Sequence, residues 1–236
     1  MRPPKKLSVL VAHHAPMIRY CLAKLMQSDT RFTVTGETGE APVARRLFRE
    51  FVPDLVVLSL TLQHGDGYSL LKDLRKTQPA VRALIVSGRR DSLSVQRAFK
   101  AGAKGYVTSA DDPAEVLKAL ERISEGERYV SDSVAQGLLL MLANGSVAAR
   151  GNGCEELSDR ELQVFRLIGS GLGTSRVARE LQVSVKTIET HRQRIKQKLG
   201  LTTGAELTQR AVNWLMQTAR EPRKRNGQTK DSPHRF

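Results

Sequence analysis

Short apolar runs alternate with amphipathic stretches through the first half of the chain. The runs at residues 7–12 and 55–60 have the length and branched side chains of buried strands. The stretches between such runs repeat apolar residues at helical spacing, which is typical of βα units around a parallel sheet. We expect strands at residues 7–12, 32–37, 55–60, 83–86 and 105–108, and helices at residues 16–27, 42–51, 68–77, 93–101 and 113–125. Five βα units imply a flavodoxin-like doubly wound fold, with a ligand site beyond the carboxyl ends of the strands.

The pattern changes to short helices between residues 157 and 201. Ser158 and Glu161 form a capping box at the start of the first helix. A glycine-rich break and a second short helix follow, and Ser184 is placed to cap a third helix. The apolar positions of that third helix are Ile188, Ile195 and Leu199.

The outer face of the third helix is polar. Its side chains can hydrogen-bond base edges or neutralise phosphates, and the helix follows another helix through a tight turn. This order matches a helix-turn-helix that docks in the DNA major groove. An ordinary solvated helix face is the alternative, but the turn and the basic composition together favour DNA. The polar positions are Lys186, Glu189, Thr190, Gln193, Arg194 and Gln197.

The runs SDRELQVFRLI and SVKTIETHRQRIKQKLG in this region carry a family resemblance. They resemble the LuxR-type (GerE-like) DNA-binding domain that ends NarL/FixJ response regulators. The resemblance implies an all-α four-helix domain whose last helix contributes to a dimer contact, through Val212, Trp214 and Leu215; alternatively, Trp214 completes the small core. It also implies base contacts by Glu189, Thr190 and Gln193, and phosphate contacts by Lys186, Thr187, Arg194 and Lys198.

The first half resembles the receiver domain of the same response regulators. The resemblance rests on PDLVVLSLTLQHGDGYSLL, ALIVSG and KAGAKGYVTS. Receivers hold Mg²⁺ with an acidic pair, accept phosphate on an aspartate, and neutralise the phosphate with a lysine. Here the resemblance aligns His13 and His14 with the acidic pair, Ser59 with the phosphoacceptor and Ser109 with the lysine. Ser87, at the hydroxyl position, and Tyr106, at the switch aromatic position, are retained.

These replacements change the expected chemistry of the receiver. Mg²⁺ prefers carboxylate oxygens to imidazole nitrogens, and a serine oxygen cannot form an acyl phosphate. We therefore expect no metal, no cofactor and no switching by aspartyl phosphorylation. His13 and His14 are then loop residues without a role, a soft-metal or proton-sensing pair, or part of a pocket for an anion or small molecule. Asp66, between two glycines, is expected to be a turn residue.

Bulk properties fit a two-domain protein that acts on an anionic partner. The net charge is +14, spread over both halves, so charge alone does not locate a DNA site. With two cysteines, we expect no disulfide framework and a reduced cytoplasmic setting, and we expect Cys154 to be exposed. No apolar run approaches a membrane span. The expected segments are a receiver-like domain at 1–126, a connecting helix and linker at 127–156, a helix-turn-helix domain at 157–219 and a disordered basic tail at 220–236.

The sequence thus predicts a transcriptional regulator that binds double-stranded DNA, as a homodimer on an inverted repeat, independently of aspartyl phosphorylation. Three alternatives stay open. The receiver could be a protein-interaction or adaptor module, or a heterodimer partner, with DNA binding secondary. Phosphorylation could fall on another residue in an ordinary two-component scheme. Enzymatic activity is disfavoured because no nucleophile–base pair is evident. A partner protein or a small-molecule effector at the receiver is also left open.

Overall fold

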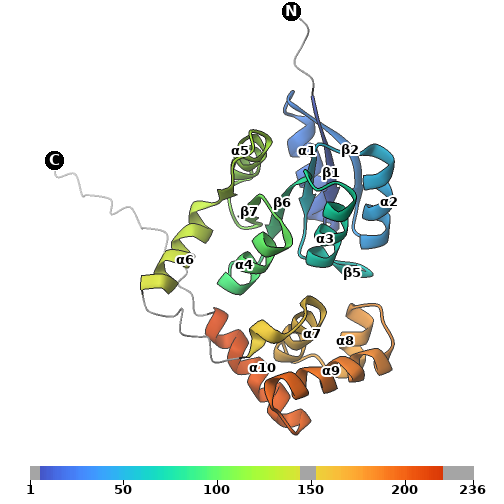
Figure 1. Ribbon diagram of the computed structural model, residues 1–236, viewed down its shortest axis with the longest axis vertical. Coiled ribbons are helices and arrows are strands. Elements are labelled where there is room, and N and C mark those ends of the chain that lie inside the picture. The colour runs from blue at the N-terminus through green and yellow to red at the C-terminus, as the bar shows by residue number, and fades with distance from the viewer. Residues whose placement is uncertain (1–5, 144–152, 220–236) are drawn as a thin grey trace, which may run out of the picture.

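The structure is a computed structural model that describes residues 6–143 and 153–219. An N-terminal α/β domain is followed by helix α6 (Asp132–Ala143) and a C-terminal helical domain (Figure 1). The fold class predicted from the sequence is confirmed. The glycine-rich part of the expected linker, at 144–152, and the basic tail at 220–236 lie outside the described residues.

The sheet of the α/β domain is parallel throughout, in the strand order β2-β1-β3-β6-β7-β8. Two features differ from the sequence prediction. The third strand ends at Leu58, and a short antiparallel hairpin, β4 (Thr61–Leu62) with β5 (Gly65–Asp66), follows it. A sixth strand of two residues was too short to predict. The strands of the sheet are β1 (Leu7–Ala12), β2 (Phe32–Thr38), β3 (Leu55–Leu58), β6 (Arg82–Ser87), β7 (Gly105–Thr108) and β8 (Tyr129–Val130).

Helices cover both faces of the sheet, as a doubly wound fold requires. Helices α1 (Pro16–Gln27) and α5 (Pro113–Ser124) pack on one face, and their core includes Met26 and Leu120. The other face carries three helices and the start of α6, and Phe48 and Tyr106 are buried in its core. Those three helices are α2 (Ala41–Phe51), α3 (Gly67–Thr77) and α4 (Ser92–Ala101).

Local capping sets the helix boundaries near the carboxyl ends of the strands. Asp66, expected to be a turn residue, is the N-cap of α3 and accepts a hydrogen bond from the Ser69 backbone N–H at 2.8 Å. Asp91 caps α4 in the same way, by accepting from Ser94. At its other end α4 stops at Gly102, whose φ of +108° suits a residue without a Cβ.

Four α-helices and one short 3₁₀ helix, η2 (Cys154–Glu156), build the C-terminal domain. Helices α7 and α10 cross so closely that a Cβ on Gly169 would lie 2.6 Å from the Ala211 carbonyl oxygen. Cys154 is buried in this core, so the prediction that it is exposed was wrong. Burial raises the pKa of its thiol to about 11. The α-helices are α7 (Asp159–Gly169), α8 (Thr174–Glu180), α9 (Val185–Leu199) and α10 (Gly204–Ala219).

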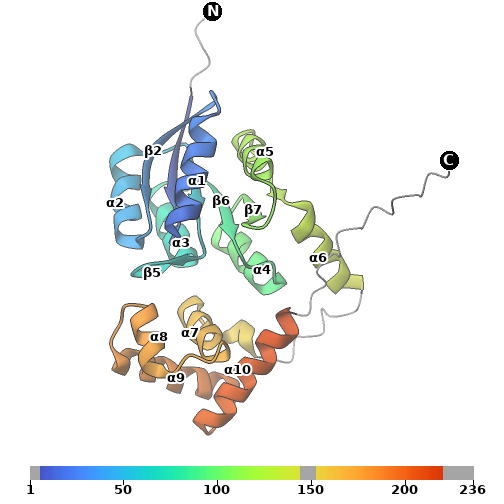
Figure 2. The same cartoon turned by 180° about the vertical axis from the view of Figure 1, so that it is seen from behind.

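The helical domain packs beneath the end of the α/β domain where α3, α4 and β5 lie. In Figures 1 and 2, α7 and α8 lie between the α/β domain and α9, so α9 is on the far side of the helical domain. Within residues 6–143 and 153–219, no helix is both long enough and apolar enough to cross a membrane.

Candidate functional site

Helix α9 has the predicted start, end and buried side. The Ser184 hydroxyl accepts from the Thr187 backbone N–H at 3.0 Å, which caps the first turn, and Gly200 ends the helix with a φ of +65°. Ile188 and Ile195 are fully buried against the other helices of the domain. The orientation of α9 is therefore fixed by its own core contacts.

The opposite side of α9 presents polar side chains to solvent. Four of the predicted contact residues, Lys186, Glu189, Gln193 and Arg194, are exposed, and within the described part of the chain their side chains form no hydrogen bond or ion pair. Thr190 is also exposed, and its hydroxyl donates to the Lys186 carbonyl oxygen at 3.0 Å. Thr187 is half-buried, with its hydroxyl 2.8 Å from that of Ser184. The structure thus gathers six of the seven predicted DNA contacts on the N-terminal part of one helix.

Lys198, the seventh predicted contact, has a structural partner that the sequence did not reveal. Its Nζ lies 2.7 Å from the Glu161 carboxylate and 3.2 Å from the Glu156 carbonyl oxygen. Burial raises the pKa of Glu161, but the bonds from Lys198 and Ser158 lower it more, so its pKa lies below the ordinary value. Glu161 also completes the capping box of α7, and this ion pair therefore ties α9 to the first turn of α7.

Trp214 on α10 belongs to the core of the helical domain. Its indole is 5.9 Å from the Phe165 ring, and the Arg166 guanidinium lies over it at 4.8 Å. Of the two interpretations of Trp214, the core position is therefore the one observed. Val212 and Leu215 are half-buried on the same helix, and Met216 is exposed.

A buried ion pair joins the two domains. Arg166 of α7 donates to the Asp91 carboxylate at 3.0 and 3.2 Å, and also to the Ser94 hydroxyl at 3.0 Å. Both charged side chains are only 9% exposed. Burial raises the pKa of Asp91, but Arg166 and the hydrogen bonds from Ser94 lower it more, and the net pKa is below the ordinary value. Leu93 of α4 also packs against the core of the helical domain.

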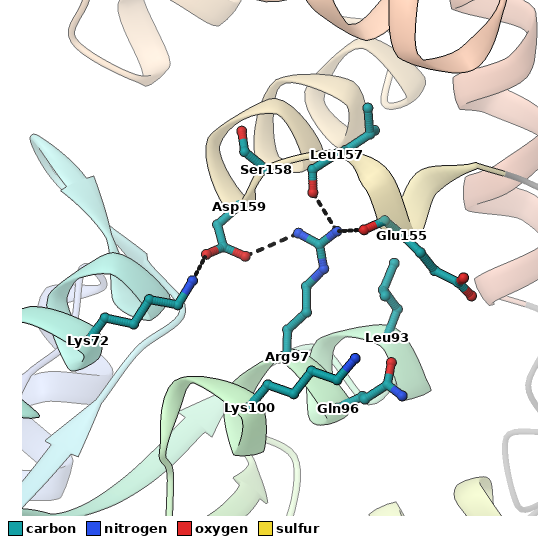
Figure 3. A pocket seen from close by; sticks show the side chains of 9 residues that line it. All are labelled: Lys72, Leu93, Gln96, Arg97, Lys100, Glu155, Leu157, Ser158 and Asp159. Carbon is teal, nitrogen blue, oxygen red and sulfur yellow. Dashed lines mark hydrogen bonds and ion pairs between the residues drawn. The ribbon is translucent and has the colours of Figure 1, made fainter.

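A second, more open set of ionic contacts lies beside the first (Figure 3). Arg97 of α4 lies 3.1 Å from the Asp159 carboxylate, which Lys72 of α3 also reaches at 2.8 Å. The same guanidinium donates to the backbone carbonyls of Cys154, Glu155 and Leu157. These contacts fix the start of α7 against α3 and α4. These contacts could not be predicted from the sequence, because their partners lie 57 to 87 residues apart.

At the carboxyl end of the sheet, the structure brings together three residues that the receiver resemblance singled out, His13, His14 and Ser59. The rings of His13 and His14 stack at 4.9 Å, and His14 Nδ1 lies 3.1 Å from the Ser59 hydroxyl oxygen. No base stands beside Ser59 in the sequence; the fold supplies the His14 imidazole, because β1 and β3 are neighbours in the sheet. Burial, with the neighbouring His14, lowers the pKa of His13 to about 4.

The remaining predicted pocket residues lie at the ends of β6 and β7. Ser87 is buried and Ser109 is exposed. The two strand ends lie close together, because a Cβ added to Gly88, the residue after Ser87, would lie 3.5 Å from the Ser109 hydroxyl. Tyr106 is fully buried and donates its hydroxyl to the Arg89 carbonyl oxygen at 2.7 Å. Burial raises the pKa of this phenol. The switch position is therefore held in an inward orientation.

This donor set does not fit Mg²⁺. His13 Nδ1 accepts a hydrogen bond from the Ala15 backbone N–H, and the oxygen beside His14 Nδ1 is the Ser59 hydroxyl. A hard cation with a preference for carboxylates gains little from imidazole and hydroxyl groups. Among the residues described, no group of three or more His, Cys, Asp or Glu is placed to hold a metal ion.

Comparisons with known proteins identify both domains. A family model described as the luxR family of bacterial regulatory proteins matches residues 155–211, and the response regulator receiver domain matches residues 9–121. A solved two-component response regulator of the LuxR family, from Aurantimonas sp. SI85-9A1, is 35% identical, with a TM-score of 0.54 over 56% of this chain and 94% of that chain. This chain belongs to the LuxR family of response regulators.

A transcriptional activator and a promoter-bound protein of known structure align along most of the chain. The transcriptional activator protein ExaE of Pseudomonas putida is 29% identical over 206 residues, which are 87% of this chain and 96% of ExaE. The structure of RcsB from Salmonella enterica serovar Typhimurium bound to a promoter is 22% identical, with a TM-score of 0.60 over 89% of this chain and 100% of that chain. RcsB shows the shared fold. This response regulator is thus a transcription factor with a receiver and a helix-turn-helix DNA-binding domain.

Proposed function

We propose that this response regulator binds specific DNA sequences through the exposed face of α9, without activation by aspartyl phosphorylation. The observation that carries the proposal is the arrangement of the domains. The receiver packs against α7 and α8, while α9 lies on the far side with its polar face exposed (Figure 2). The receiver therefore leaves the reading face free, and no signal is needed to uncover it.

The roles on α9 follow from chemistry and position. Glu189, Thr190 and Gln193 lie on the exposed face near the N-terminal end, which a helix-turn-helix inserts in the major groove. Their amide, hydroxyl and carboxylate groups can read base edges. Lys186, Thr187 and Arg194 are proposed to hold phosphates and set the register. Lys198 stays a predicted phosphate contact, and its pairing with Glu161 should make its contribution to salt dependence smaller than that of Lys186.

Independence from aspartyl phosphorylation is supported by the pocket. Ser59 follows β3 in the phosphoacceptor position implied by the receiver resemblance, and His13 and His14 offer no site for Mg²⁺. Two other carboxylates of the receiver form hydrogen bonds that maintain its structure. Asp66 caps α3, and Asp111 accepts a hydrogen bond from the Thr108 backbone N–H at 2.8 Å. Phosphorylation of either would disrupt the bonds that form these turns.

Binding as a homodimer on an inverted repeat is part of the proposal. Helix α10 exposes Met216 beside the half-buried Val212 and Leu215, which supports a contact between two copies of the helical domain. Since each copy carries one α9, two copies related by a two-fold axis would read two half-sites of opposite direction.

The proposal is tested by selecting bound genomic fragments with the unphosphorylated full-length protein, then titrating salt on the best site. We expect an inverted repeat, a steep salt slope, and no change in affinity after treatment with acetyl phosphate. Weak binding that ignores sequence would contradict the DNA-reading role of α9. Affinity that rises with acetyl phosphate, and is lost when Asp66 or Asp111 is replaced, would contradict independence from phosphorylation.

A second candidate function, as a protein-interaction partner, is favoured by one surface. Helix α1 exposes Met17 and Tyr20, one turn apart, to 73% and 58%. If protein interaction is the main role, Met17→Ser with Tyr20→Ser should abolish regulation in cells, and the α9 variants should leave it intact. DNA binding as the main role predicts the opposite order of effects.

A further inference from the structure

A cleft of about 510 Å³ opens between the two domains, beside the ionic contacts of Arg97 (Figure 3). This volume lies in the range that small-molecule sites occupy. One wall comes from α3 and α4 of the receiver, and the other comes from η2 and the start of α7. The receiver wall contributes basic side chains and the helical domain contributes acidic ones.

Only some of these charges are already paired. Lys72 and Arg97 share the Asp159 carboxylate. Among the described residues, Lys100 and Glu155 form no ion pair, and the side chain of Gln96 forms no hydrogen bond. In Figure 3, the Lys100 amino group and the Gln96 amide lie on one side of Leu93, and the Glu155 carboxylate lies on the other. The cleft thus holds a cation and an anion that form no ion pair with each other, and Leu93 gives it an apolar surface as well.

The charges select the class of ligand. A simple anion would meet Lys100 but would be repelled by Glu155. A simple cation would meet Glu155 but would be repelled by Lys100. A molecule that carries both charges satisfies both walls, because charge-assisted hydrogen bonds form at each end.

We propose that this cleft binds a free α-amino acid as a zwitterion. Its carboxylate pairs with Lys100 and the Gln96 amide, its ammonium group pairs with Glu155, and its side chain lies against Leu93. The ligand then links α4 of the receiver to η2 of the helical domain. It adds to the contacts of Arg97 and stabilises the arrangement in which α9 faces outward. An amino acid would therefore act as an effector of this regulator at a site separate from the His13–Ser59 pocket.

The test uses the full-length protein and does not depend on DNA binding. Each standard L-amino acid is added alone at about 10 mM, and the melting temperature is recorded; a ligand that binds only the folded state raises it. Isothermal titration of the best one gives its Kd. We expect Lys100→Gln and Glu155→Gln each to raise that Kd about 10- to 100-fold, the size of one charge-assisted hydrogen bond. Lys100→Arg should retain binding.

Controls separate the zwitterion site from simpler alternatives. Lys76→Ala removes an 80% exposed lysine outside the cleft, and its Kd should equal that of the unaltered protein. Acetate and methylamine test each charge alone, and both should bind far more weakly than the amino acid. Three results would overturn the proposal: no amino acid raises the melting temperature, the two glutamine variants bind as tightly as Lys76→Ala, or acetate binds as well as the amino acid.

Discussion

The buried pair between Arg166 and Asp91 predicts that removing one charge, by Asp91→Asn, weakens the docking of the two domains. In Asp91→Asn, the amide oxygen can still cap α4, but Arg166 loses its counter-charge. Breaking a buried pair by removing one partner costs about 3–5 kcal/mol. Because the retained cap keeps one acceptor near Arg166, we expect the lower end, about 3 kcal/mol, which weakens domain docking by about 10²-fold. The loss cannot exceed the docking free energy, since separation returns Arg166 to water.

Docking is measured by the radius of gyration in solution and by amide hydrogen exchange over residues 153–162. A double-mutant cycle with Arg166→Met isolates the pair. The matched control is Asp73→Asn, which breaks the half-buried pair with Arg45 inside the receiver and should cost under about 1 kcal/mol. The reasoning is refuted if Asp91→Asn and Asp73→Asn give the same radius of gyration, or if the coupling between positions 91 and 166 is below about 0.5 kcal/mol.

The same pair sets a pH dependence in the unaltered protein. The pKa of Asp91 is lower in the folded state than the ordinary value of 3.8. The docked arrangement therefore gains stability from this carboxylate above about pH 4, and loses it as the pH falls further toward the lower folded pKa. We expect the radius of gyration to increase on acidification below pH 4 before the receiver unfolds, and the increase to be absent in Asp91→Asn, which starts expanded.

Three further predictions follow from single positions. Gln193→Ala should relax discrimination at one base pair by roughly 1–3 kcal/mol. Lys186→Ala should weaken binding to all DNA sequences similarly and reduce the slope of log affinity against log salt concentration by about one. Equal slopes for Lys186→Ala and the unaltered protein would exclude a phosphate contact. Exposed Cys21 should react quickly with a thiol reagent, and Cys154, buried and with a pKa of about 11, should react only in denaturant; two fast thiols would contradict this. The free energy of unfolding should fall as the pH drops from 6.5 toward 4, because the unfolded chain protonates His13 while the folded chain does not, and His13→Gln should reduce this slope in chemical denaturation; an unchanged slope would count against the low pKa.

Features set by neighbouring residues could be predicted from the sequence. Ser158 and Glu161 form the capping box three residues apart, and Ile188 and Ile195 fall on one face because the helical period alone places them there. Ser184 and Gly200 end α9 for equally local reasons. The alternation of strands and helices fixed the fold class in the same way.

Features that depend on packing between distant segments could not be predicted. Arg166 and Asp91 are 75 residues apart, and nothing near either one marks it as a partner. Ser59 meets His14 only because β3 and β1 are adjacent in the sheet. Cys154 follows a polar stretch, and its burial depends on helices that come later in the chain.

The first turn of α7 forms ion pairs both with the receiver and with α9. The first turn of α7 contains Asp159, held by Arg97 and Lys72 of the receiver, and two residues later Glu161, which holds Lys198 of α9. Because Asp159 and Glu161 are two residues apart on one helix, a movement of α4 that pulls on Asp159 also acts on the ion pair that joins α7 to α9. For the DNA-binding role proposed for α9, this coupling predicts that the receiver influences α9 while it stays docked on the helical domain, so that a change in the receiver would alter the preferred DNA sequence more than the overall affinity.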